Sequence, residues 1–222
     1  MLNLTARYRI AYVKNKILLI HQETFNLAPS SPFDFDSTFH KPDHFPSPDN
    51  LWQPGTRWQT YFWQDQQIGL KFENTGSGQK PKITTTVFSQ LDLPSQFLDS
   101  LKDEITYRYN LSMDLTDFYS LFKADPILKT SLEKFEGMRS GHAGSLYEYI
   151  IIGIVLQNTT VKRSVQMLEN LFQNYGALLN FDGKDLWAFW APGQPSRNQR
   201  RGFKKAQTWL QSKINKKNRR SL

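Results

Sequence analysis

The chain has 222 residues, a net charge of +8 and no cysteine, which excludes disulfides, thiolate metal sites, iron–sulfur clusters and a cysteine nucleophile. Aromatic residues make up 14% of it, enough for a substantial core, and it has no run of 18 apolar residues that could span a bilayer. Because its first residues also lack the pattern of a signal peptide, we expect a cytoplasmic protein that does not engage a membrane.

The first hundred residues have the alternation of apolar and polar side chains that is typical of strands. Residues 6–26 predict a hairpin, residues 58–72 predict two further strands, and the β-branched residues 82–88 predict another. Residues 27–50, rich in proline, aspartate and serine, predict a long ordered loop. An antiparallel sheet is therefore expected at the beginning of the chain.

Helices are expected after the sheet, because apolar residues then recur every three or four positions. Asp114 and Asp125 are expected to cap two of them, the second with Pro126 in its first turn, and Gly176 is expected just beyond the end of the last. The predicted helices cover residues 94–109, 114–123, a stretch from 126, 145–156 and 161–175. A sheet followed by helices predicts the α+β class.

The last two of these helices are joined by a short polar turn, Gln157-Asn158-Thr159-Thr160. The helix 145–156 is apolar nearly all round, which predicts that it is buried, whereas 161–175 has one apolar stripe. A buried helix that ends in amides and hydroxyls can hold a polar probe at a surface. Two ordinary core helices with a capped turn are the alternative.

This region resembles the helix-hairpin-helix DNA glycosylase superfamily, on the branch of 3-methyladenine DNA glycosylase II and 8-oxoguanine DNA glycosylase. Gly137-Met138-Arg139, the apolar helix, the turn and the helix that ends at Tyr175-Gly176 follow the order and spacing of that family. Residues 33–63 are similar to the N-terminal region of its bacterial and archaeal members. The resemblance covers about 25–192.

The resemblance implies an N-terminal antiparallel sheet with a flanking helix (1–110), a partial helical domain (111–192) and a basic tail (193–222). It also implies base-excision repair, in which a damaged base, expected to be alkylated, is flipped out of duplex DNA and released by hydrolysis. In this family a residue of the turn enters the DNA stack, and Asn158 is the matching residue. The implied protein is a cofactor-free, metal-free monomer bound to damaged double-stranded DNA, near the nucleoid in a bacterium or archaeon.

The family's catalytic aspartate follows a glycine-rich hairpin that binds phosphate, and neither is found here, since no acid follows Asp185. We therefore assign no catalytic residue and expect a truncated glycosylase, with residues 193–222 as native or frameshifted sequence. That segment has ten lysines and arginines and no acid, so the preceding 192 residues carry a net charge of −2. Alternatives are a non-catalytic DNA-binding protein, for which a genuine basic tail is suited, and an inactive fragment.

The predicted DNA-binding residues belong to the turn and to the first turn of the following helix, where free backbone N–H groups favour an anion. Lys162 and Arg163 could hold backbone phosphates there, although a solvated basic face behind a threonine cap is equally compatible with the pattern. The assigned residues are Gln157, Asn158, Thr159, Thr160, Lys162 and Arg163.

Three further assignments concern side chains outside the turn. Trp52, expected in a loop, is a candidate wall of a base pocket. Arg139 and Glu148 are expected to form a structural ion pair rather than a catalytic one. His40 and His44 are expected to be structural or solvated rather than metal ligands.

Overall fold

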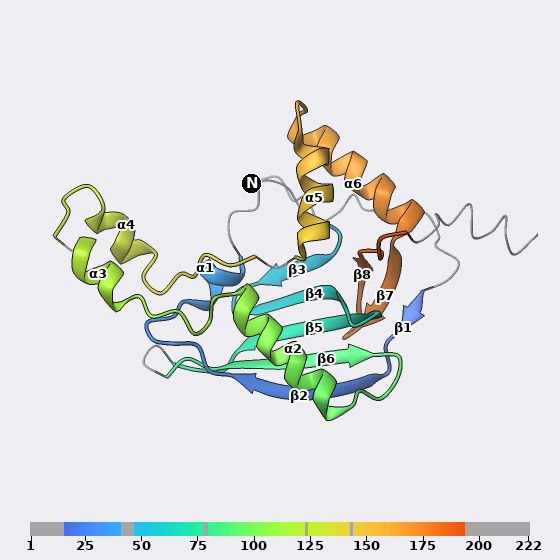
Figure 1. Ribbon diagram of the computed structural model, residues 1–222, viewed down its shortest axis with the longest axis horizontal. Helices are drawn as coiled ribbons and strands as arrows, with labels where there is room; N and C mark the ends of the chain where they lie inside the picture. Colours follow the sequence, from blue (N-terminus) through green and yellow to red (C-terminus); the bar gives the residue numbers. More distant parts are fainter. Residues whose placement is uncertain (1–15, 41–46, 78–79, 123, 143, 194–222) are drawn as a thin grey trace, which may run out of the picture.

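The computed structural model describes residues 16–40, 47–77, 80–122, 124–142 and 144–193, and its centre is a five-stranded sheet (Figure 1). Every pair of neighbours in the sheet is antiparallel, so the predicted antiparallel sheet is confirmed. The strand order is β2-β6-β5-β4-β3, with β2 His21–Leu27, β3 Asn50–Gln53, β4 Thr56–Trp63, β5 Gln66–Asn74 and β6 Ile83–Ser89.

The predicted strands at 58–72 and 82–88 are confirmed as β4, β5 and β6. Gln64 and Asp65 join β4 to β5 with φ angles of 44° and 62°, the backbone of a tight two-residue hairpin turn. The first half of the predicted 6–26 hairpin lies outside the described residues. In the described part, β2 pairs with β6, and β1 (Ile17–Leu18) pairs in parallel with β7 (Ala177–Phe181).

One face of the central sheet carries the larger core. Side chains alternate along β4, so Arg57, Gln59 and Tyr61 point to the same face as the buried residues of β5 and β6. Helices α1 (Phe35–Phe39) and α2 (Ser95–Arg108) cover this face, and α2 lies across it in Figure 1. The core there includes Phe35, Phe39, Ile68, Leu70, Phe72, Leu101, Ile105 and Tyr109.

Helix α1 lies in the segment that the sequence predicted to be a loop. Asp34 explains its start, because the carboxylate accepts the backbone N–H of Ser37 at 2.7 Å. Helix α2 was predicted from 94 to 109 and is confirmed within a residue at each end.

The opposite face packs on a second sheet of order β1-β7-β8, where β8 is Lys184–Ala188. Trp58 and Phe88 of the central sheet meet Phe181 of β7. Gly69 allows this contact, since a Cβ on it would lie 2.6 Å from the Phe181 ring. The sequence did not predict β7 and β8, which follow the last helix.

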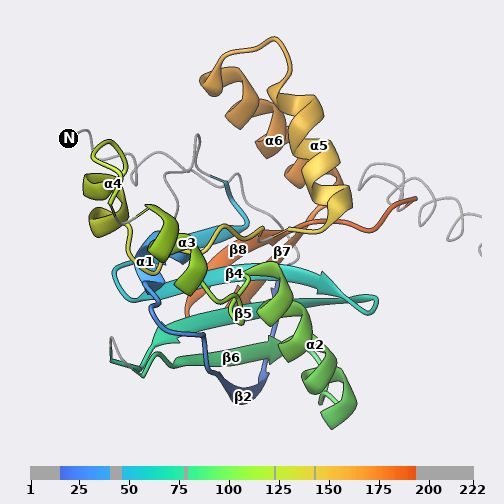
Figure 2. The ribbon, with the colours of Figure 1, turned by 60° about the vertical axis from the view of Figure 1, so that its left-hand side comes forward.

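The remaining helices are α3 (Thr116–Phe122), α4 (Lys129–Lys134), α5 (Leu146–Leu156) and α6 (Val161–Tyr175), which complete the predicted α+β fold. Asp114 accepts the N–H of Thr116 at the start of α3, as expected. The predicted cap of α4 is wrong, because α4 begins at Lys129 with Leu128 as its N-cap, and Asp125 accepts the N–H groups of Ile127 and Leu128 in the turn before it. Helices α5 and α6 form a hairpin that rises from the sheets, away from α3 and α4 (Figures 1 and 2). None of the helices in the described part is long and apolar enough to cross a membrane.

Candidate nucleic-acid interface

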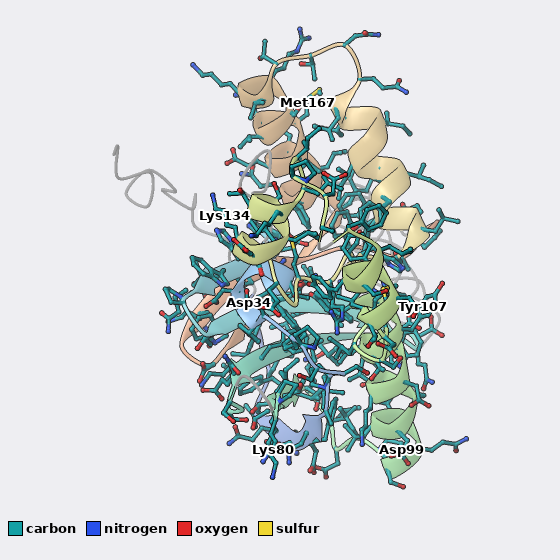
Figure 3. The ribbon with its side chains drawn as sticks, turned by 90° about the vertical axis from the view of Figure 1, so that its left-hand side faces the viewer. Asp34, Lys80, Asp99, Tyr107, Lys134 and Met167 are labelled. Carbon is teal, nitrogen blue, oxygen red and sulfur yellow. The ribbon has the colours of Figure 1, made fainter. Side chains whose placement is uncertain are left out.

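The turn between α5 and α6 is the outermost part of the helical hairpin, and its side chains fan outward in Figure 3. Helix α5 starts with a capping box, in which Ser145 accepts the N–H of Glu148 while Glu148 accepts the N–H of Ser145. It ends at Leu156 with Gln157 as its C-cap, and Asn158 then adopts a left-handed backbone with φ of 48°. Asparagine tolerates that conformation better than most residues, so it suits this position.

Two hydroxyls fix the entry to α6. Thr160 is its N-cap and accepts the N–H of Arg163 at 3.4 Å, so the threonine cap that the sequence left as an alternative is present. Ser164, which no sequence pattern indicated, donates its buried hydroxyl to the carbonyl of Val155 at 3.1 Å. The Ser164 side chain thus connects α6 to α5 across the base of the turn.

The predicted DNA-binding residues are brought together on this turn. Five of them are exposed, and Thr159 is partly buried with a hydroxyl that has no hydrogen-bond partner within the described chain. The first turn of α6 contains Lys162 and Arg163 and no acid. Positive side chains therefore lie beside the free N–H groups of a helix N-terminus, which is a favourable environment for an anion.

The prediction that the first helix of the pair is buried is wrong. In α5 only Glu148 and Val155 are buried, whereas apolar residues such as Ile150 and Ile154 are 51% and 61% exposed. The composition of the helix could not show this, because an all-round apolar helix lacks a distinct buried stripe. Only one side of it packs, against α6 and the β7–β8 sheet.

The predicted ion pair between Arg139 and Glu148 is not formed. Arg139 is fully buried and donates to the carbonyls of Ser30, at 2.7 Å, and Gly137. Its backbone N–H donates to the Thr38 hydroxyl. The arginine therefore links the loop before α5 to the segment around α1, and its role is structural as expected but with other partners.

Glu148 lies in the first turn of α5, 8% exposed, where the charges of Asp49 and Arg108 act on it. Burial raises the pKa of its carboxyl to about 7, and the charge of Asp49 adds to this, while the N–H of Ser145 and the charge of Arg108 oppose it. Burial also raises the pKa of Asp49. The influence of Asp49 and Arg108 on Glu148 was not predicted, since the three residues are far apart in the sequence.

Trp52 does not lie in a loop but in the edge strand β3. Its indole N–H donates to Asp36 at 3.0 Å, and its ring stacks on His40 at 3.8 Å between centroids. Asp36 also accepts the N–H of Gly55, so it ties α1 to the β3–β4 turn. These contacts account for Trp52 structurally, and its role in a base pocket remains a prediction.

His40 is described, with its ring stacked on Trp52, whereas His44 lies outside the described residues. Among the residues that are described, no three histidines or acids are grouped closely enough to hold a metal ion.

Comparison with known proteins supports the resemblance found in the sequence. The DNA-3-methyladenine glycosylase of Bacillus subtilis is 31% identical over 81 residues, which are 36% of this chain and 27% of that protein. A probable N-glycosylase/DNA lyase of Methanothermobacter thermautotrophicus is 28% identical over 102 residues, 46% of this chain and 31% of that one. No family model matches the chain.

Solved structures share the fold. The match to the 3-methyladenine DNA glycosylase of Archaeoglobus fulgidus covers 75% of this chain and 56% of the Archaeoglobus chain, with a TM-score of 0.58 and 12% sequence identity. The match to the apo form of the 8-oxoguanine glycosylase/lyase of Clostridium acetobutylicum covers 78% of this chain and 55% of the Clostridium chain, with a TM-score of 0.52 and 17% sequence identity. Part of the chain is thus similar in sequence to DNA glycosylases, and most of it shares the fold of solved DNA glycosylases. The chain spans about half the length of these solved chains and about a third or less of the curated relatives.

Proposed function

We propose that this protein is a DNA glycosylase of base-excision repair that binds damaged double-stranded DNA through the α5–α6 turn. The observation that carries the proposal is the turn itself. It places exposed amides, a left-handed asparagine and two cations at the end of the α5–α6 hairpin, and the relatives of the chain are glycosylases. The Clostridium enzyme has also been solved with double-stranded DNA, at a TM-score of 0.50 to this chain.

The proposed binding mode has two parts. Lys162, Arg163 and the N-terminal N–H groups of α6 hold backbone phosphate, which sets affinity and its salt dependence. Asn158 enters the stack where a damaged nucleotide has been extruded, at a cost of a few kcal/mol in stacking and pairing. A damaged or abasic site is easier to extrude than a normal pair, so the turn favours it.

The favoured substrate is an alkylated base, which is the substrate class of the 3-methyladenine branch of the family. The same interface would also serve a DNA-binding protein that releases no base. An assay of base release from duplexes with 3-methyladenine or 8-oxoguanine distinguishes the two, with binding measured in parallel.

The binding proposal itself is tested by removing the two cations. Lys162→Gln with Arg163→Gln should weaken duplex binding and reduce the slope of log affinity against log salt by about 2, because each cation neutralises one phosphate. Lys102→Gln with Lys129→Gln removes two exposed lysines from α2 and α4 and provides the matched control. If both double variants show the same decrease in affinity and slope, binding reflects net charge and the turn is not the interface.

A further inference from the structure

Three apolar side chains flank the polar turn between α5 and α6 and are exposed. Ile154 and Leu156, in the last turn of α5, are 61% and 38% exposed, and Val161, the first residue of α6, is 53% exposed. Helical residues two positions apart point in directions about 200° apart, so Ile154 and Leu156 lie on opposite sides of α5. We call these three residues the collar of the turn.

Packing within the hairpin does not account for the collar. The apolar residues that pack there, such as Val155 and Leu168, are buried in the cluster that α5 and α6 form with β7 and β8. Further along α6, the exposed outer positions are polar, namely Gln166, Asn170 and Gln173. Exposed apolar side chains that gather in one place, rather than occurring singly, mark interaction sites.

The charge around the collar suits a nucleic acid. Lys162 and Arg163 directly follow Val161 and are exposed, and residues 149–168 contain no aspartate or glutamate. A polyanion is therefore attracted to this end of the hairpin. The collar is also continuous with the turn through which DNA binding is proposed above.

We propose that the collar binds the base faces that duplex DNA exposes where a base step has opened, as at a gap, whether or not a base is damaged. The inference rests on the proposed function, since Lys162 and Arg163 hold the DNA at the turn. In an intact duplex the stacked base pairs cover one another, whereas an opened step presents flat apolar faces. Leucine and isoleucine are among the side chains that proteins pack against opened base steps.

The cations and the collar then contribute differently to binding. Phosphate contacts set an affinity that falls with salt and is shared by all duplexes. Apolar contacts with base faces add an affinity that depends little on salt and is specific to opened DNA. The two contributions can therefore be measured separately.

The test removes the apolar character of the collar without changing any charge. Ile154→Ser with Val161→Ser is the collar variant. Leu146→Ser with Ile127→Ser is the matched control, because these residues are 78% and 83% exposed and lie away from the turn. Leu146 begins α5, about 15 Å along the helix from its last residue. Affinity is measured at several salt concentrations for an intact duplex and for an undamaged duplex with a short gap in one strand.

We expect the parent to bind the gapped duplex more tightly than the intact one. The collar variant should bind the gapped duplex about tenfold more weakly than the parent, and the intact duplex less than about threefold more weakly. Its slope of log affinity against log salt should be unchanged, because no phosphate contact is lost. The control should bind both duplexes like the parent, as should Ile154→Val with Val161→Ile, which keeps the collar apolar.

Equal binding of the gapped duplex by the collar variant and the control would overturn the proposal, as would an equal loss by the collar variant on both duplexes. A parent dimer that the collar variant converts to a monomer would also overturn it, since the collar would then join two copies of the chain. Lys162→Gln with Arg163→Gln separates this inference from the proposed function. A smaller salt slope in that variant, with no effect in the collar variant, would overturn the inference alone, whereas no effect in either would contradict the proposed function as well.

Discussion

Ser164 donates its hydroxyl to the carbonyl of Val155 at 3.1 Å, across the base of the α5–α6 turn. The hydroxyl is buried, and the carbonyl belongs to the last turn of α5, where backbone acceptors have no partner within the helix. One side chain thus satisfies a helix end and fixes the angle at which α6 leaves the turn.

Ser164→Ala should therefore lower the free energy of unfolding by about 1–2 kcal/mol, because it leaves the Val155 carbonyl buried without this donor. Denaturant unfolding measures the decrease, and hydrogen exchange should increase in the turn. Ser120→Ala is the matched control, since Ser120 donates to a helix carbonyl on the exposed surface of α3. Equal effects of the two variants would show that the bond across the turn is unimportant.

A pair of glycines in the hairpin should respond in opposite directions to alanine. Gly176 has an ordinary φ of −67°, but a Cβ on it would lie 2.7 Å from the Phe172 carbonyl oxygen and 2.8 Å from that of Ala188. Gly176→Ala should thus destabilise the protein by about 1–3 kcal/mol, as overpacking does. Gly153→Ala, in the middle of α5 with free space around it, should stabilise by about 0.5–1 kcal/mol.

Thermal unfolding of both glycine variants measures the difference. If Gly176→Ala were neutral, the close approach of α6 to β8 would not be a constraint, and the glycine would need another explanation.

Glu148 should make stability depend on pH between about 4.5 and 7. Because burial raises the pKa of its carboxyl to about 7, the folded chain binds more protons than the unfolded chain in this range. Stability is then highest below the unfolded pKa and falls as pH rises through the folded one. The total decrease is roughly 3 kcal/mol at most.

Glu148→Gln keeps an acceptor for the N–H of Ser145 and removes the titration. Urea unfolding at about pH 5 and about pH 7.5 should show a clearly smaller pH dependence in this variant than in the parent. Asp49, whose pKa is also raised by burial, will keep part of the slope. An unchanged slope would mean that Glu148 is ionised freely in the folded protein.

Local sequence patterns predicted most of the fold because they act over a few residues. The alternation in 58–72 and the extents of α5 and α6 depend on neighbours along the chain, and they were predicted correctly. Strands β7 and β8 were missed because they are short, and Trp187 packs against residues far from it in sequence. Helix α1 was missed because proline and aspartate around it favour turns.

Some features of the candidate site were likewise predictable from the sequence, and others were not. The turn residues are contiguous, so the sequence could place them together, and the left-handed backbone of Asn158 agrees with its residue type. The partners of Arg139 could not be predicted, because Ser30 and Thr38 are about a hundred residues away and are brought to it by folding. The exposed face of α5 shows the same limit, since composition does not determine which surfaces find a partner.

The central claim is that the side chain of Asn158 enters damaged DNA, and a comparison of two variants tests it most directly. Asn158→Gly keeps the left-handed backbone and removes the side chain, whereas Asn158→Ala also strains the backbone, by about 1 kcal/mol. Gln64→Gly is the control, a similar change at a left-handed residue in the β4–β5 turn.

Affinity for a duplex with an abasic site and for the intact duplex should be measured for all three variants at one salt concentration. We predict that both Asn158 variants bind the abasic duplex about tenfold more weakly than the parent, equivalent to about 1.4 kcal/mol, with a much smaller effect on the intact duplex. Gln64→Gly should bind both duplexes like the parent. Equal weakening by Asn158→Gly on both duplexes, or no weakening on either, would contradict the claim.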